Sequence, residues 1–184
     1  MPLLLSLNLS DSDLGRFRDI LQQACARADG LPREQVIAGA RQRLEEVRQS
    51  DAPDFVRRPM ERIGQLLDML SDADWDLPED DADRVLSALA YFSDPQDLIP
   101  DNTPIVGFLD DAIMVEIVCA ALEHEIRAYQ DFVEFRANGE QAHDQTPTRR
   151  ADWLEVRRRQ LHERMRRLRD GKRAKNTKSP FSLF

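Results

Sequence analysis

Residues 97–111 read Asp97-Leu98-Ile99-Pro100-Asp101-Asn102-Thr103-Pro104-Ile105-Val106-Gly107-Phe108-Leu109-Asp110-Asp111. This segment, here named the aspartate loop, sets four aspartates, two prolines and one glycine among large apolar residues. Proline and glycine fix backbone shapes that other residues adopt less readily. The apolar side chains favour burial, whereas a buried aspartate needs a hydrogen-bond or ion-pair partner. The composition therefore predicts a specified loop rather than a spacer.

Apolar residues recur every three or four positions on both sides of the aspartate loop. This spacing is typical of amphipathic helices. The pattern predicts helices over residues 11–28, 32–50, 55–70, 78–92, 110–139 and 146–170. We expect an all-α fold, packed as an irregular bundle of about six helices.

Capping residues mark three of the predicted helix ends. Ser10 suits an N-cap position, and Gly30 suits the position just beyond a helix C-terminus. Asn138-Gly139 is expected to close the long helix that begins at Asp110 or Asp111.

The N-terminus carries a different pattern. Leu3, Leu5, Leu7 and Leu9 occupy alternate positions, which is strand periodicity. A single strand in an all-α chain leaves backbone groups unpaired, and the same strand of a second copy could pair with them. The sequence predicts a short N-terminal extended strand or arm, and a homodimer is one consequence.

Charge divides the chain into two parts. Residues 1–148 carry 13 basic and 30 acidic side chains, for a net charge of −17, whereas residues 149–184 carry 13 basic and 4 acidic ones, for +9. We expect an acidic helical domain over residues 1–140, followed by a basic helix and flexible tail over residues 141–184.

The remaining composition indicates a cytoplasmic protein. Cys25 and Cys119 lie far apart on apolar helical stripes, as reduced core thiols do. The apolar N-terminus lacks the basic region and cleavage site of a signal peptide, and the longest apolar run, residues 112–122, is about half of the ~20 residues that a membrane span needs. No membrane span is expected.

The aspartate loop allows two interpretations. Oxygen ligands of this type suit Mg²⁺ or Ca²⁺, so the weak metal candidates are Asp97, Asp101, Asp110 and Asp111. The favoured interpretation is structural, with the aspartates capping turns and a helix start while the apolar residues plug the bundle end. The loop positions expected to matter, as structure or as a ligand surface, are Asp97, Pro100, Asp101, Pro104, Gly107, Asp110 and Asp111.

The same segment resembles the signature of the YkvA-like family, a bacterial domain of unknown function whose members carry a run close to D-L-I-P-D-x-x-P-x-x-G-x-L-D-D. The resemblance is specific in the loop and extends more loosely from about Val85 to Phe135. Asn102-Thr103 is more polar than the corresponding positions of many relatives, and Gln96 stands where many have Ile or Val. The resemblance implies no known activity.

The basic helix is the second candidate region. Its arginines could neutralise phosphates, or could lie on an acidic patch of the same chain or of a dimer mate. The acidic patch that would match contains Asp72, Asp74, Asp76, Glu79, Asp80, Asp81 and Asp83. The arginines expected to contact nucleic acid or an acidic partner are Arg157, Arg158, Arg164, Arg166, Arg167 and Arg169.

The last residues, Phe181-Ser182-Leu183-Phe184, loosely resemble the short apolar peptides by which bacterial replication and repair proteins dock on the sliding clamp. The usual leading glutamine is absent, and Pro180 stands in its place. Clamp binding is a minor alternative.

Together these features favour a non-enzymatic interaction or regulatory module with a protein partner. No catalytic residue, cofactor or firm metal site is predicted, because no histidine or cysteine stands in a nucleophile pattern. Two alternatives stay open: a nucleic-acid-associated accessory protein that uses the basic helix, and a metal-dependent enzyme that uses the loop aspartates.

Overall fold

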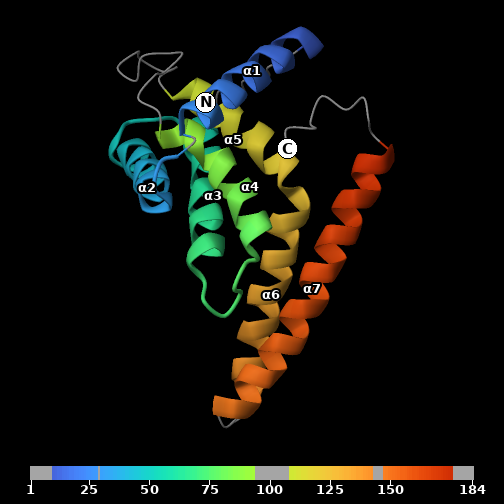
Figure 1. The fold of residues 1–184 in the computed structure, drawn as a ribbon. Coiled ribbons are helices and arrows are strands. Elements are labelled where there is room, and N and C mark those ends of the chain that lie inside the picture. Colours follow the sequence, from blue (N-terminus) through green and yellow to red (C-terminus); the bar gives the residue numbers. More distant parts are fainter. Residues whose placement is uncertain (1–9, 29, 94–107, 143–146, 176–184) are drawn as a thin grey trace.

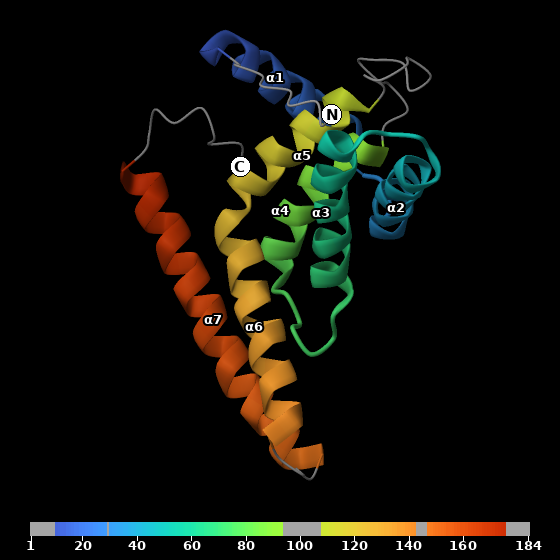
Figure 2. The ribbon, with the colours of Figure 1, turned by 180° about the vertical axis from the view of Figure 1, so that it is seen from behind.

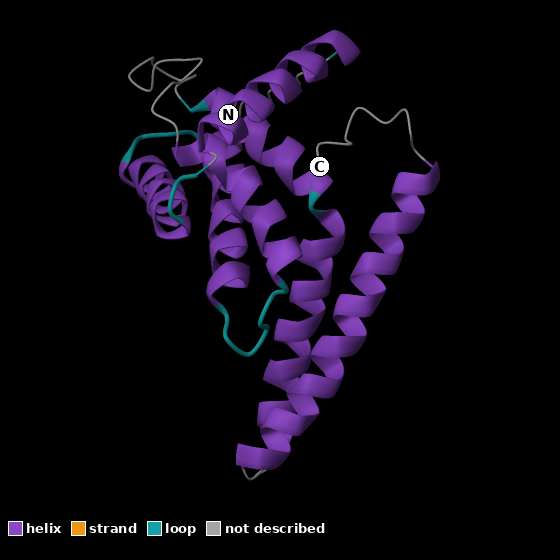
Figure 3. Ribbon diagram, in the orientation of Figure 1, coloured by secondary structure: helices purple, strands orange, loops and turns teal. Residues whose placement is uncertain are grey.

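The computed structural model describes residues 10–28, 30–93, 108–142 and 147–175. The chain forms an irregular helical bundle, and Figure 3 shows helices joined by loops with no strand among these residues. The helices are α1 (Asp11–Ala28), α2 (Arg33–Gln49), α3 (Asp54–Ser71), α4 (Glu79–Leu89), the 3-10 helix η1 (Ala90–Ser93), α5 (Leu109–Ala121), α6 (Glu123–Ala142) and α7 (Pro147–Lys175). The all-α prediction is confirmed. The N-terminal strand, the clamp-like terminus and most of the aspartate loop lie outside the described residues.

Local sequence explains where several helices begin. Ser10 caps α1, since its Oγ accepts a hydrogen bond from the Asp13 backbone N–H at 3.3 Å and Asp13 Oδ2 accepts one from the Ser10 N–H at 3.0 Å. Pro32, Pro53 and Pro78 precede α2, α3 and α4, where a missing backbone N–H costs nothing. Gly30 has a φ of +84°, the left-handed backbone expected beyond a helix end.

The long helix predicted after the aspartate loop is two helices. The backbone of Leu122, with φ −98° and ψ 20°, interrupts the helix between α5 and α6. The predicted end at Asn138-Gly139 is wrong, because α6 continues to Ala142. Gly139 instead lets α7 approach: a Cβ built at this glycine would lie 1.9 Å from the Trp153 ring.

Every α-helix contributes buried residues to one core, in which α3 packs against α5 and α2, and α6 packs against α7 (Figures 1 and 2). Trp75, in the loop between α3 and α4, is fully buried and contacts the rings of Phe132 and His162 at centroid distances of 5.1 and 4.2 Å. This loop thereby joins α6 to α7. The basic helix is part of the bundle, since Leu154, Leu161 and Met165 belong to the same core.

The two longest helices set the shape of the molecule. α6 and α7 run antiparallel, lie against each other over their lower halves in Figure 1, and diverge toward the upper end of α7. Phe135 of α6 and Trp153 of α7 stack at 4.1 Å with an interplanar angle of 23°. The acidic loop between α3 and α4 reaches down beside this pair of helices (Figure 1).

Candidate functional site

The described end of the aspartate loop lies in the first turn of α5. Asp110 and Asp111 are 2% and 1% exposed. The Tyr91 hydroxyl of η1 donates to Asp110 Oδ2 at 3.4 Å, and Arg43 Nε of α2 lies 2.9 Å from Asp111 Oδ2. Since Arg43 also lies over the ring of Phe108 at 5.1 Å, these contacts tie α2, η1 and α5 together.

The carboxylates of Asp110 and Asp111 therefore form contacts that stabilise the fold. The Tyr91 phenol engages one oxygen of Asp110, and the Arg43 guanidinium engages one oxygen of Asp111. Among the residues that the structure describes, no group of three or more Asp, Glu, His or Cys side chains could hold a metal ion. The other predicted loop residues lie outside the described ranges: Asp97, Pro100, Asp101, Pro104 and Gly107.

Five arginines of α7 pair with carboxylates elsewhere in the chain. Arg150 pairs with Asp74 at 3.1 Å, Arg158 with Asp76 at 3.5 Å, Arg164 with Asp131 at 3.0 Å and Arg166 with Asp81 at 3.4 Å. Arg169 pairs with both Asp81 and Glu125. Of the alternatives that the sequence left open for the basic helix, the structure shows contact with the acidic patch of its own chain at Asp74, Asp76 and Asp81.

Two of these carboxylates are fully buried. Asp81 of α4 and Glu125 of α6 are both 0% exposed, and Arg169 lies between them with Arg84 3.4 Å from Glu125. Burial lowers the pKa of Arg84, although Glu125 opposes that shift. Burial also opposes the charge on Arg169, but its contacts with Asp81 and Glu125 outweigh that effect and raise its pKa. In this cluster, the buried carboxylates and the two guanidinium groups therefore stabilise one another's charges.

A second cluster surrounds the loop between α3 and α4. Arg136 donates to both Asp72 oxygens at 2.8 and 2.9 Å, and the Tyr129 hydroxyl donates to Asp72 Oδ2 at 3.1 Å. Burial alone would raise the pKa of Asp72, but these bonds and the backbone N–H of Trp75 lower it. The loop that carries the acidic patch is thereby fixed to α6.

The other two arginines expected to contact a partner lie differently. The Arg157 guanidinium lies 5.1 Å from the ring centroid of Phe135, a cation–π contact within the α6–α7 pair. Arg167 is 80% exposed and pairs with Glu163 of the same helix at 3.0 Å.

Histidine and cysteine show the properties of packing residues. Burial, followed by the charges of Arg166 and Arg158, lowers the pKa of His162 to about 4, so this ring is neutral at pH 7. Burial raises the pKa of Cys119 to about 11 and that of Cys25 above its ordinary value, so both thiols stay protonated. Neither property suits a nucleophile or general base at neutral pH.

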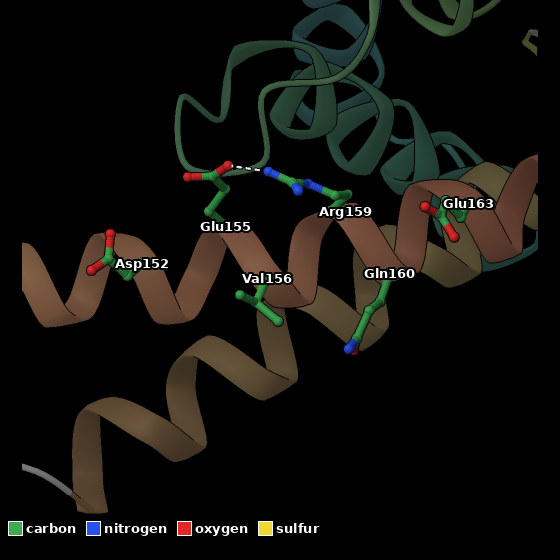
Figure 4. A pocket seen from close by; sticks show the side chains of 6 residues that line it. All are labelled: Asp152, Glu155, Val156, Arg159, Gln160 and Glu163. Atoms are coloured by element: carbon green, nitrogen blue, oxygen red, sulfur yellow. Dashed lines mark hydrogen bonds and ion pairs between the residues drawn. The ribbon is translucent and has the colours of Figure 1, made fainter.

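Several surface hollows border α7. A polar groove of about 740 Å³ separates α7 from Arg33 and from the loop at Asp76–Glu79. It is lined by four arginines and four acidic residues, so its charges balance. A shallower hollow of about 460 Å³ follows the outward face of α7 (Figure 4), where Val156 is 59% exposed.

Sequence reasoning missed the partners of the candidate residues. Arg43, Tyr91, Arg84, Glu125 and Arg136 meet their partners across 19 to 68 positions of the chain. Local periodicity carries no signal for such pairs. The sequence signal that could indicate their burial is that several of these charged residues interrupt otherwise apolar helical faces.

Comparison with known proteins adds one finding. A family model described as a protein of unknown function, DUF1232, matches residues 84–117, less than a fifth of the chain. The matched segment runs from α4 through η1 to α5 and includes Tyr91, Asp110 and Asp111. No curated protein and no solved structure matches the chain. None of the helices in the described part of the chain combines the length and apolar composition that a bilayer crossing requires. The chain thus contains a segment similar to an uncharacterised protein family.

Proposed function

We propose that this protein is a non-enzymatic interaction module, in which the bundle holds α7 rigidly and presents its outward face to a protein partner. The observation that carries the proposal is the difference in ion-pair partners between the two faces of α7. Arg150, Arg164 and Arg169 pair with carboxylates of other elements. On the outward face, around the exposed Val156, the ion pairs Glu155–Arg159 and Glu163–Arg167 join residues of α7 itself. A helix that is already ordered binds without a further ordering cost.

The segment matched by the family model serves this module as structure. Its buried contacts are those of Tyr91 with Asp110 and of Arg43 with Asp111. They join η1, α2 and α5. The YkvA-like signature falls within the matched segment, and we propose that both describe the same domain. The free thiols of Cys25 and Cys119 fit a reducing cytoplasm.

The ion pairs of α7 weigh against the nucleic-acid alternative. A phosphate contact by Arg158, Arg166 or Arg169 would compete with an intramolecular carboxylate. The metal-dependent alternative meets the same difficulty at Asp111, whose partner is the Arg43 guanidinium. Protein contact through the exposed face requires no such exchange.

Site-specific photo-crosslinking in living cells tests the proposal. A photoreactive amino acid would replace Val156 on the outward face of α7 and, as the matched control, Gln65, which is exposed on α3. We expect discrete crosslinked protein species from position 156 and none from position 65. Equal patterns from both positions, or crosslinks to nucleic acid alone, would contradict the proposal.

A further inference from the structure

The outward face of α7 carries an alternating row of charges. Glu155, Arg159, Glu163 and Arg167 follow one another at four-residue spacing, and the first three are drawn along the helix in Figure 4. Their side chains are 48%, 71%, 59% and 80% exposed. Each helical residue turns by about 100°, so the four residues occupy a sector of about 120° centred opposite the buried Leu161.

Within the described part of the chain, these four charges form ion pairs with one another along the helix. Glu155 pairs with Arg159, and Glu163 pairs with Arg167 at 3.0 Å. A carboxylate accepts several hydrogen bonds and a guanidinium has five N–H donors, so each group retains capacity for a second partner. Arg150, Arg164 and Arg169 differ, because they reach the acidic loop, α6 and α4. Arg166, which lies within the same sector as the row, pairs with Asp81 of α4, and Glu155, Arg159 and Glu163 also line the polar groove beside the loop at Asp76–Glu79.

The order of the charges makes this row complementary to itself. When two copies of α7 cross antiparallel about a two-fold axis beside Leu161, Glu155 faces the partner's Arg167 and Arg159 faces the partner's Glu163. The two-fold axis repeats both contacts, which gives four ion pairs. Rows of residues four apart are the ridges that pack together in the commonest class of helix crossing.

The alternation also selects one register. Moving the axis by two residues in either direction sets Arg159 opposite the partner's Arg159, or Glu163 opposite the partner's Glu163. Like charges in contact oppose association. We propose that the outward face of α7 is a homodimer surface, on which a second copy of this chain docks through Glu155, Arg159, Glu163 and Arg167. This inference rests on the proposed function, whose partner at this face it identifies.

The expected association is weak and sensitive to salt. Exposed ion pairs contribute little individually and are screened by added electrolyte. Val156, beside the row, adds an apolar contact at the rim of the crossing. Dimerisation should therefore appear at low ionic strength and high protein concentration.

Two half-exchange variants test the surface. The first combines Glu155→Arg with Arg159→Glu, and the second combines Glu163→Arg with Arg167→Glu. Each keeps the net charge and the two opposite-charge pairs within the helix, 155–159 and 163–167, but sets like charges against each other in its own homodimer. In a mixture, every position of one variant faces an opposite charge of the other.

Sedimentation velocity in low-salt buffer gives the readout, with circular dichroism to establish that both variants fold. We expect the wild-type chain to associate with rising concentration, each half-exchange variant to remain monomeric, and an equimolar mixture to recover association. Recovery cannot come from a folding defect. A monomeric wild type, half-exchange variants that associate as wild type does, or a mixture that stays monomeric would each overturn the inference.

The outcome also separates this inference from the proposed function. Crosslinks from position 156 to other proteins, together with a monomeric wild-type chain, would overturn the homodimer surface and leave the interaction module standing. Absence of both crosslinks and self-association would overturn both.

Discussion

The two faces of α7 carry the same kinds of residue and use them in different ways. On the inner face, Arg169 compensates two carboxylates that are fully buried on other helices. On the outer face, Arg167 pairs with Glu163 one turn away, and both side chains are more than half exposed. Burial therefore decides whether an arginine is part of the fold or part of the surface, and the contrast predicts very different costs of mutation.

The largest effect is expected at Arg169. Replacing it as Arg169→Gln leaves Asp81 and Glu125 with less compensation in the interior, and breaking such a buried pair costs about 3–5 kcal/mol. The free energy of unfolding from urea titration measures this loss. The matched control is Arg167→Gln, expected to change stability by less than about 1 kcal/mol. Equal losses in the two variants would remove the distinction between the faces.

The base of the aspartate loop should show the next largest effect. Asp111→Asn keeps the side-chain shape but removes the charge beside Arg43, and a hydrogen bond to a charged group contributes about 1.5–3 kcal/mol. Glu116→Gln on the same helix is the control, because its pair with Arg62 is largely exposed and should contribute less than about 1 kcal/mol. Chemical denaturation of both variants compares them. If Asp111→Asn has the same unfolding free energy as the wild-type chain, this carboxylate has no structural role.

A glycine comparison tests how closely α6 and α7 approach. Gly139→Ala places a Cβ 1.9 Å from the Trp153 ring and should disturb its stack on Phe135, at a cost of about 1–3 kcal/mol. Gly15→Ala in α1 meets nothing within 4 Å and should instead stabilise the chain by about 0.5–1 kcal/mol. Thermal unfolding should move in opposite directions for the two variants, and a shift in the same direction would contradict the observed packing.

A further effect concerns pH. His162 has a folded pKa of about 4, below its ordinary value of 6.5, so the unfolded chain binds more protons between these values. Stability should therefore fall as the pH drops from 6.5 toward 4, by up to about 3 kcal/mol. The pKa of Asp72 is lowered from 3.8, so its contribution is lost mainly below pH 4. His162→Phe should flatten the slope of unfolding free energy between pH 6.5 and 4.5, and an unchanged slope would assign it to other groups.

The helical fold was predictable because helix formation is recorded locally. The periodicity of apolar residues, the Ser10 cap and the proline starts located six helical stretches close to the observed bounds. The break at Leu122 was not predictable, because the apolar pattern of residues 112–133 continues across it. Gly139 was misread as a helix end because its actual role, admitting Trp153, depends on a residue of another helix.

The candidate site was predictable only in part. The charge contrast between the two parts of the chain indicated that α7 could lie on the acidic loop, and Asp74, Asp76 and Asp81 do pair with it. The sequence indicated Asp81 only as one member of the acidic patch, yet it is fully buried. Its burial depends on Arg166 and Arg169, which lie 85 and 88 positions away. No local pattern contains that information.

Native-state hydrogen exchange of α7 tests most directly whether this helix is integral to the bundle. Because Leu154, Leu161 and Met165 share the core with α3 and α5, their amides should exchange only when the whole domain unfolds. The account predicts the same opening free energy for amides of residues 154–165 as for the buried amides of α3. Exchange of the α7 amides at a clearly lower free energy, while α3 stays protected, would show that α7 detaches on its own and would contradict the account.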